Sequence, residues 1–387
     1  MRRLSSHFKR AVLWTALVAS LITASTWASV WYYVHASHQE PLPIKDLRAA
    51  LLSSASHSLS LHIDTQNIQV KPAVIEKWFE SYTRAYTGRN DVRVSDRLTD
   101  YLQTLAQQTG KPAQDVRFVV TNGKISIIAS AQEGKKLTVA GADQMVRQAL
   151  LADISDVTLP TEPVQPAITE DTISHLNITE KLATGQSNFS GSTLARIQNI
   201  TVSSALYNGL LIPAGQTFSF NTILGPVEAE QGYAPEKVII GNSLQYQYGG
   251  GICQVSTTMF RAAVAAGFPI LERHPHAFPV HYYEPQGFDA TIYPGSADLR
   301  FINDTPSYVL VQTRMVGKNL YFDFYGTSDG RIVTVDGPHQ YDQQPDGSLK
   351  AYFVRTINFA DGASKSQTFN SVYKSPKLYP TEPNPYL

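Results

Sequence analysis

The chain has 387 residues, of which 43% are hydrophobic, and its 32 basic side chains balance its 32 acidic ones. A chain of this length exceeds what one compact domain usually holds, so we expect two folded domains. A net charge of zero excludes the broad basic surface with which nucleic-acid-binding proteins attract a polyanion, so no nucleic acid is expected as a partner.

The N-terminal segment has the pattern of a membrane anchor. Residues 11–34 carry no charged side chain, and a helix of that length can cross about 30 Å of hydrocarbon. Four basic residues in the segment 1–10 precede this run, which by the positive-inside rule keeps residues 1–10 in the cytoplasm. The alternative is a cleaved signal peptide, for which the small residues at 24–28 offer a weak cleavage site. We therefore predict a single-pass protein of the cell membrane with its remaining domains on the extracytoplasmic side.

Residues 45–155 mix two kinds of apolar spacing. Residues 59–62 and 68–70 alternate as strands do, whereas residues 98–105 space their apolar side chains as a helix does. This pattern predicts a small α+β domain. Residues 156–172 contain Pro160, Pro163 and Pro166 and few apolar side chains, which is typical of a linker.

Residues 173–370 consist mainly of short strand-like runs separated by Gly, Pro and Asn. Two segments, 194–208 and 254–266, have helical spacing. The pattern predicts a β-rich domain with a C-terminal β extension, followed by a Pro-rich tail at 371–387.

Cys253 is the only cysteine, so it cannot form a disulfide within the chain. It follows three glycines, 249–251, that allow a sharp turn, and it precedes Ser and Thr residues of the kind that cap helices. Amides at a helix start lower the pKa of a thiol and can stabilise an oxyanion. We therefore predict Cys253 as a nucleophile, with Gly250, Gly251 and Gln254 forming the oxyanion loop. The alternative is a buried structural cysteine.

Three histidines follow within eight residues, His274, His276 and His281. An imidazole can accept the thiol proton, and we predict either His276 or His274 as the base. Asp289 is the candidate that orients this histidine. The alternatives are a zinc site made by the three histidines with Asp289, or histidines that only pack or face water.

Three further residues are candidates for substrate binding. Arg273 can bind a carboxylate bidentately, or it can pair with Glu272. Ser256 and Thr257 carry hydroxyls directly after the predicted nucleophile. We expect no metal and no cofactor.

The segment of about 183–325 resembles the VanW family in several motifs that occur in order. They are Arg196-Ile-Gln-Asn-Ile200, Leu211-Ile-Pro-Ala-Gly-Gln-Thr-Phe-Ser-Phe-Asn221, Leu224-Gly-Pro226, Gly232-Tyr233, Gly249-Gly-Gly-Ile-Cys-Gln-Val-Ser-Thr-Thr258, Arg273-His-Pro-His276 and Gly287-Phe-Asp-Ala-Thr291. The region 45–155 is similar to the peptidoglycan-binding domain found before VanW domains and before some L,D-transpeptidase domains. The chain departs from the family at Met259-Phe-Arg261, where members commonly have Leu-Tyr-Asn.

The resemblance implies that the partner is peptidoglycan. Some VanW-domain proteins are regarded as L,D-transpeptidases with a catalytic cysteine, which corresponds to Cys253 here. The expected fold is α+β: an N-terminal transmembrane helix, a small α+β domain, and a β-rich VanW domain whose Gly-rich loop leads into a helix. The expected function is crosslinking of stem peptides through a thioester; the alternatives are a thiol hydrolase and a non-catalytic wall-binding or scaffold protein.

Overall fold

The computed structural model describes residues 53, 56–85, 88 and 90–386. They divide into two compact units. The first unit takes the residues up to Pro112 together with Gly134–Val164, and the second takes Ala113–Glu133 and the residues from Gln165 onward. The division therefore does not fall at a single point of the chain, because a segment of the second unit interrupts the first.

The predicted membrane-spanning helix requires a correction. No helix in the described part of the chain is long and apolar enough to cross a membrane; the longest, α5 and α8, have 14 residues each, whereas a span needs about 20. The predicted span, 11–34, and the predicted cytoplasmic tail, 1–10, lie outside the described residues. We therefore do not retain the transmembrane helix in the fold class, nor the single-pass membrane localisation.

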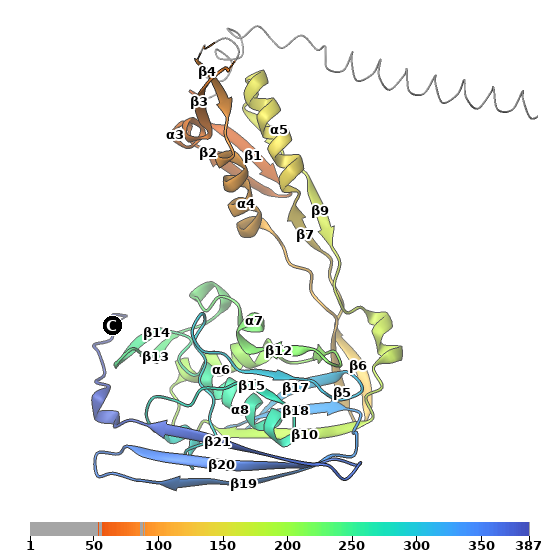
Figure 1. The fold of residues 1–387 in the computed structure, drawn as a ribbon, viewed down its shortest axis with the longest axis vertical. Helices are drawn as coiled ribbons and strands as arrows, with labels where there is room; N and C mark the ends of the chain where they lie inside the picture. Colours follow the sequence, from red (N-terminus) through yellow and green to blue (C-terminus); the bar gives the residue numbers. More distant parts are fainter. Residues whose placement is uncertain (1–52, 54–55, 86–87, 89, 387) are drawn as a thin grey trace, which may run out of the picture. The chain divides into compact units, whose positions relative to one another are not determined.

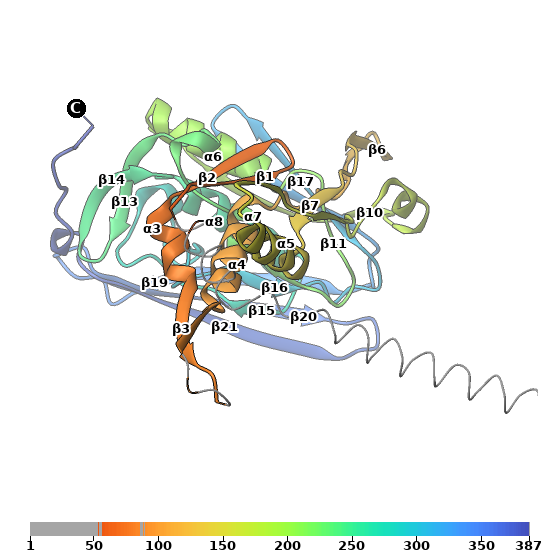
Figure 2. The same ribbon diagram turned by 90° about the horizontal axis from the view of Figure 1, so that it is seen from above.

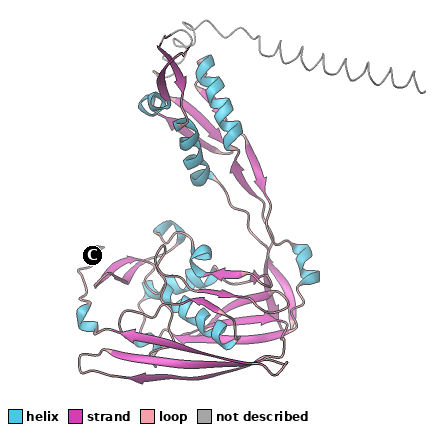
Figure 3. Cartoon of the chain, in the orientation of Figure 1, coloured by secondary structure: helices cyan, strands magenta, loops and turns pink. Residues whose placement is uncertain are grey.

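The first unit combines short strands with two amphipathic helices (Figure 3). Its strands are β1 (Leu59–Ile63), β2 (Gln66–Val70), β3 (Phe79–Thr83), β4 (Asn90–Val94), β7 (Gly134–Leu137), β8 (Asp156–Thr158) and β9 (Thr161–Val164). Its helices are α3 (Pro72–Ile75), α4 (Arg97–Thr109) and α5 (Val139–Ala152). The two long helices bury apolar faces that include Leu98, Leu102 and Val146 in one core with β1.

The predicted linker is wrong over its first half. Strand β8 pairs with β1 in parallel, and β9 pairs with β7 in an antiparallel ladder. Val157 and Leu159 are buried in the first core, so this segment does have apolar side chains to bury. The prolines at 160 and 163 suggested a linker, but proline is compatible with the ends and edges of strands.

The second unit contains several small antiparallel sheets (Figure 1). The first has the order β10-β18-β17-β11, namely Glu180–Asn188, Asn319–Gly326, Val309–Val316 and Leu210–Ile212. The second has the order β12-β16-β15, namely Thr217–Ser219, Arg300–Ile302 and Ile270–Glu272. The third has the order β19-β20-β21, namely Ile332–Tyr341, Leu349–Asn358 and Ser364–Tyr373. The hairpins are β5 with β6 (Arg117–Thr121, Lys124–Ala129) and β13 with β14 (Pro235–Ile240, Ser243–Tyr248).

Helix α8 (Ile252–Ala265) occupies the centre of the second unit, and α6 (Leu194–Ala205) and α7 (Phe220–Leu224) are its other α-helices. One face of α8 packs on β10 so closely that a Cβ at Gly185 would lie 2.1 Å from the Thr258 carbonyl oxygen. The opposite face presents Phe260 to Phe353 and Phe369 of the third sheet. Helix α8 is therefore held between two sheets, and this fixes the position of its first turn.

The C-terminal segment continues beyond β21 along the edge of hairpin β13–β14 (Figures 1 and 2). Leu244 of β14 forms a parallel bridge with Thr381, and its amide donates to the Pro380 carbonyl at 2.9 Å. Strand β21 extends to Tyr373, beyond residue 371, where we predicted that the tail begins. The residues at the end of β21 therefore belong to a sheet and are available to the site described next.

Candidate active site

The Gly-rich loop connects β14 directly to α8. Gly249 and Gly251 have positive φ angles of 91° and 113°. A Cβ at Gly250 would lie 2.6 Å from the Lys237 carbonyl oxygen on β13, so the loop passes too close to that strand for any side chain. This turn places Cys253 as the second residue of α8, at the helix start, as the sequence predicted.

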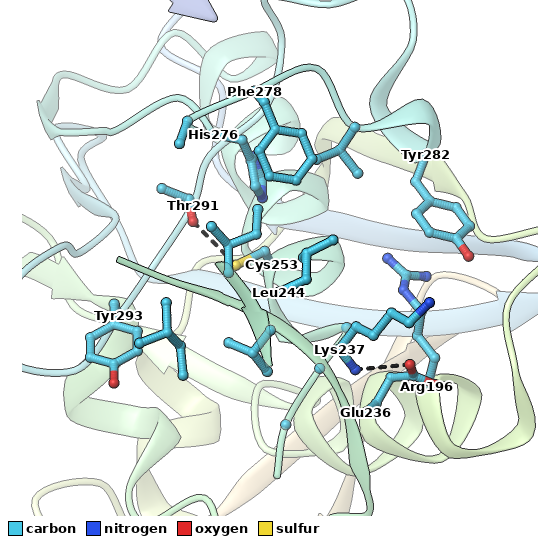
Figure 4. Close-up of a pocket in the computed structure, with 18 of the residues that line it drawn as sticks. Arg196, Glu236, Lys237, Leu244, Cys253, His276, Phe278, Tyr282, Thr291 and Tyr293 are labelled. Carbon is cyan, nitrogen blue, oxygen red and sulfur yellow. Dashed lines mark hydrogen bonds between the residues drawn. The ribbon is translucent and has the colours of Figure 1, made fainter. Parts of the chain in front are cut away.

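Cys253 is half-buried and faces a pocket of about 790 Å³ (Figure 4). Its Sγ lies 3.4 Å from the Thr291 hydroxyl and 3.7 Å from the Ile292 carbonyl oxygen. Most of the pocket wall is apolar, with side chains from hairpin β13–β14 on one side and from the segment 275–283 on the other. The thiol is therefore accessible to a ligand in this pocket.

His276 is buried between Asp289 and Tyr283. Its Nδ1 lies 2.5 Å from Oδ2 of Asp289, and its ring stacks on Tyr283 with a centroid separation of 4.7 Å. Asp289 thus holds the proton on Nδ1, which leaves the other ring nitrogen to interact with the Cys253 thiol. The structure brings together Cys253, His276 and Asp289, the residues predicted as nucleophile, base and orienter.

Asp289 is fully buried, and four hydrogen bonds satisfy its carboxylate. Oδ2 accepts from the backbone amide of His276 at 2.9 Å and from the ring, while Oδ1 accepts from Nη2 of Arg273 at 3.1 Å and from the Tyr373 hydroxyl. Burial raises the pKa of this carboxyl, but the hydrogen bond and charge of His276, with the charge of Arg273, hold it well below its usual range. Asp289 is therefore ionised and rigidly oriented.

The pKa values of the thiol and the imidazole shift in opposite directions. Burial raises the pKa of Cys253, but the hydrogen bond and charge of His276 outweigh it, so the pKa lies below the ordinary thiol value. Burial lowers the pKa of His276, but hydrogen bonds to Asp289 and Cys253, and their charges, raise it to about 9. Both shifts favour the charged forms of the pair, a thiolate beside an imidazolium.

His274 takes no part in this arrangement. Its side chain is exposed, and its Nε2 lies 3.0 Å from Oε1 of Glu272. His281 lies on the pocket wall with its ring centroid 3.8 Å from that of Tyr282. Within the described residues no group of three or more His, Cys, Asp or Glu side chains could hold a metal ion, so the alternative zinc set is not brought together.

Arg273 does not face the pocket, contrary to its predicted role in substrate binding. Its side chain is buried, and its Nε donates to the carbonyl oxygen of Asp289 at 2.6 Å. Its Nη1 donates to the Ser371 hydroxyl at 2.9 Å. The guanidinium therefore ties Asp289 to β21 and has no free edge for a substrate.

Ser256 and Thr257 are also fully buried, so their predicted contact with substrate is wrong. Their hydroxyls donate to the carbonyl oxygen of Ala290 at 2.6 and 3.2 Å, and the Ala290 amide donates to Oγ1 of Thr257 at 3.0 Å. These bonds attach α8 to the residue that follows Asp289. They therefore set the position of the aspartate relative to the thiol.

The predicted oxyanion loop is only partly free to bind. The amide of Ile252 donates to the Gly249 carbonyl at 3.0 Å, and that of Gln254 donates to the Gly251 carbonyl at 2.9 Å. The Gln254 side chain points away from the pocket and donates to the Ser187 hydroxyl. In the first turn of α8 this leaves the amide of Cys253 itself, for which the described residues provide no acceptor.

Two residues of the site were missed in the sequence. Tyr373 lies 84 residues after Asp289, and no local pattern marks its hydroxyl as a partner of the carboxylate. Arg196 lines the pocket and donates to Oε1 of Gln254 at 2.9 Å. Arg196 opens one of the motifs quoted for the VanW resemblance, and that motif was the available signal.

A family model described as VanW-like protein matches residues 195–325. This part of the chain is a VanW-like domain. The match contains Cys253, His276 and Asp289 but ends before Tyr373. The resemblance found in the sequence is thereby confirmed.

Two curated proteins are similar to part of this chain. The uncharacterized protein YoaR of Bacillus subtilis is 31% identical over 173 residues, which are 45% of this chain and 56% of YoaR. The vancomycin B-type resistance protein VanW of Enterococcus faecalis is 32% identical over 114 residues, which are 28% of this chain and 42% of that protein. The chain thus spans about half the length of the curated relatives it matches.

Two solved structures are similar to part of this chain at low scores. The Ldtfm–avibactam carbamoyl enzyme is 13% identical with a TM-score of 0.24, over 33% of this chain and 49% of that chain. A cysteine-to-serine mutant of the Enterococcus faecium L,D-transpeptidase is 15% identical with a TM-score of 0.22, over 32% of this chain and 47% of that chain. A likeness at these scores carries no argument about activity.

Proposed function

We propose that the VanW-like domain is a cysteine acyltransferase that crosslinks peptidoglycan stem peptides, as an L,D-transpeptidase-like enzyme. The observation that carries this proposal is the arrangement of Cys253, His276 and Asp289 at the wall of an accessible pocket. The cell-wall setting is supported by the relative named as a vancomycin B-type resistance protein. The first unit, which resembles peptidoglycan-binding domains, would hold the wall polymer.

In the first half-reaction the Cys253 thiolate attacks the peptide carbonyl that follows the diamino acid of a donor stem. The new S–C bond pushes the carbonyl electrons onto oxygen, and the free amide of Cys253 donates to that oxyanion. As the C–N bond breaks, the imidazolium of His276 transfers its proton to the leaving amine. The product is a thioester on Cys253 with a neutral His276.

In the second half-reaction an amine of another stem attacks the thioester. His276 accepts the proton of that amine, the S–C bond breaks, and the thiolate–imidazolium pair is restored. Asp289 stays ionised throughout, because its four hydrogen bonds stabilise the carboxylate and it holds the imidazolium in place. No redox agent is needed, and the atoms balance between donor, acceptor and enzyme.

The test is mass spectrometry of muropeptides incubated with the purified chain, either wild type or Cys253→Ala. We expect new crosslinked dimers with the wild type and none with the variant. His274→Ala is the matched control, since His274 lies beside the site but pairs with Glu272, and it should still form dimers. Equal amounts of dimer with Cys253→Ala would refute the proposal.

Two other outcomes of the muropeptide assay would favour the alternative functions, a thiol hydrolase or a non-catalytic wall-binding protein. Shortened monomers without dimers would mean that water resolves the thioester, as in a hydrolase. Muropeptides that bind to the protein but remain unchanged would mean a non-catalytic wall-binding protein.

A further inference from the structure

Arg196 is a buried cation on the wall of the Cys253 pocket. It is the third residue of α6, and its backbone amide donates to the hydroxyl of the N-cap residue Thr193 at 3.1 Å. Only 8% of the residue is exposed. Because its backbone is fixed by the helix cap, its side chain has little freedom to turn away from the pocket.

The hydrogen-bond partners of this guanidinium are neutral. Nη1 donates to the Ser192 hydroxyl at 2.8 Å, and Nη2 donates to Oε1 of Gln254 at 2.9 Å. These bonds use two of its N–H groups and leave others, including that of Nε, for a further acceptor. Tyr282 covers one face of the group, with its ring centroid 3.6 Å from Cζ.

No carboxylate among the described residues forms an ion pair with Arg196. The nearest acidic candidate on the pocket wall, Glu236, accepts instead from the Thr193 hydroxyl and from the Lys237 amide. A buried guanidinium without an anionic partner is costly, and a bound anion would remove that cost. The preferred anion is planar, since guanidinium binds carboxylates through paired N–H groups.

Arg196 also lies close to the nucleophile. It contacts the chain on both sides of Cys253: a Cβ at Gly251 would lie 2.9 Å from its Cγ, and Nη2 bonds to Gln254. Arg196 and Cys253 also line the same pocket, so a carboxylate on this guanidinium would belong to a molecule bound in the pocket that the thiol faces.

From these contacts we infer that Arg196 is the specificity residue of the pocket and binds a carboxylate of the peptide that Cys253 attacks. This inference rests on the proposed function, because it takes Cys253 as the nucleophile. It replaces Arg273, the arginine that the sequence suggested for this task, whose guanidinium is occupied by Asp289 and β21.

The test compares the alkylation of Cys253 by iodoacetate and by iodoacetamide. In both reactions the thiolate forms an S–C bond and iodide leaves; the reagents differ only in carrying a carboxylate or a neutral amide. We expect the ratio of the two rates to fall at least about fivefold in Arg196→Gln, because the attraction of a nearby charge is lost. Arg196→Lys, which keeps the charge, should retain most of the ratio.

Two controls separate Arg196 from other cations. Lys237→Met removes the exposed lysine of the pocket wall, and Lys318→Met removes a cation on the exposed turn between β17 and β18. Both should leave the ratio within about twofold of the wild type. The inference is overturned if folded Arg196→Gln keeps the wild-type ratio, or if Lys237→Met lowers it equally.

The wild-type protein provides a measurement that does not depend on the folding of a variant. At constant ionic strength, acetate should slow alkylation by iodoacetamide more than acetamide does, and equal slowing overturns the inference. Neither measurement uses stem peptides, so the binding of a carboxylate by Arg196 is tested separately from crosslinking. A wild-type thiol that reacts with neither reagent contradicts the proposed function and this inference together.

Donor stems then identify the source of the carboxylate. One donor is amidated at its terminal carboxylate and a second at the side-chain carboxylate of the diamino acid. If Arg196 binds a given carboxylate, amidation of that carboxylate should slow the reaction of the donor with the wild type, relative to the unmodified stem. The same amidation should cause no such slowing in Arg196→Gln. Equal reaction of both amidated donors and the unmodified stem overturns the inference.

Discussion

Replacement of His276 by alanine tests the origin of the low thiol pKa. His276 provides the hydrogen bond and the charge that lower the pKa of Cys253, and without them only the opposing effect of burial and the weaker bonds to Thr291 and Ile292 remain. The pKa of the thiol in His276→Ala should therefore rise to its ordinary value or above. His274→Ala is the matched control, because that imidazole bonds to Glu272.

The size of the effect follows from the fraction of thiolate. A thiol with an ordinary pKa of about 8.5 is only about 3% ionised at pH 7, and the lowered pKa of the wild-type thiol makes its thiolate fraction larger. If the wild-type thiol is fully ionised, loss of ionisation alone slows alkylation by iodoacetamide roughly 30-fold, which is the upper limit of the effect. A thiolate of higher pKa is intrinsically more nucleophilic, which reduces the net loss to about 10-fold.

The assay is the rate of alkylation of Cys253 by iodoacetamide between pH 5 and 10, followed by mass spectrometry. The rates of the wild type and of His274→Ala should rise at lower pH than the rate of His276→Ala, because the thiol pKa is lowered in both. His276→Ala should react slowly at pH 7 and accelerate as the solution becomes alkaline. If His276→Ala reacts within about twofold of the wild type at pH 7, or if His274→Ala slows equally, the assignment of the base is wrong.

Three further substitutions test the surroundings of the pair. Tyr373→Phe removes one hydrogen bond to the buried carboxylate of Asp289. The free energy of unfolding, measured with urea, should fall by about 1.5–3 kcal/mol. No change would mean that the hydroxyl does not stabilise the aspartate. Gly250→Ala introduces a Cβ 2.6 Å from a carbonyl oxygen of β13. In the same assay this substitution should lower the free energy of unfolding by about 1–3 kcal/mol. A decrease below about 0.5 kcal/mol would show that the loop can move aside. In the wild type the raised pKa of His276 contributes stability that is lost as pH rises from 6.5 towards about 9. The lowered pKa of Cys253 contributes stability that grows as pH rises towards the ordinary thiol pKa, so the two effects oppose each other. Cys253→Ala removes the second effect together with the part of the His276 shift that Cys253 causes, and Asp289 still raises the pKa of His276. The free energy of unfolding of this variant should fall with rising pH above about 6.5, by at most about 1.4 kcal/mol per pH unit; a flat profile would contradict the effect of Asp289 on His276.

Several features of the site could be predicted from the sequence because they are local. Glycine is required wherever the backbone adopts a positive φ or passes close to another strand, and the loop before Cys253 does both. The polar residues after the cysteine indicated a helix start, and α8 begins at Ile252. The motifs that carry the VanW resemblance are local in the same sense, and the family match confirms them.

The membrane-spanning helix shows where a local pattern was not enough. The apolar run at 11–34 lies outside the described residues, and no helix of the described part is long and apolar enough to span a membrane. The linker was misread for a related reason, since the prolines near residue 160 concealed two short strands that pair with distant parts of the chain.

The roles of individual side chains were decided only by the tertiary structure. The sequence by itself determined a glycine loop, a helix start and a thiol, together with two neighbouring histidines of equal chemistry. Which histidine faces Cys253 depends on Asp289, and the orientation of Asp289 depends on Arg273 and on Tyr373, which is 84 residues away. Contacts over such separations leave no periodic pattern in the sequence, because they arise only when α8 and the third sheet pack against each other.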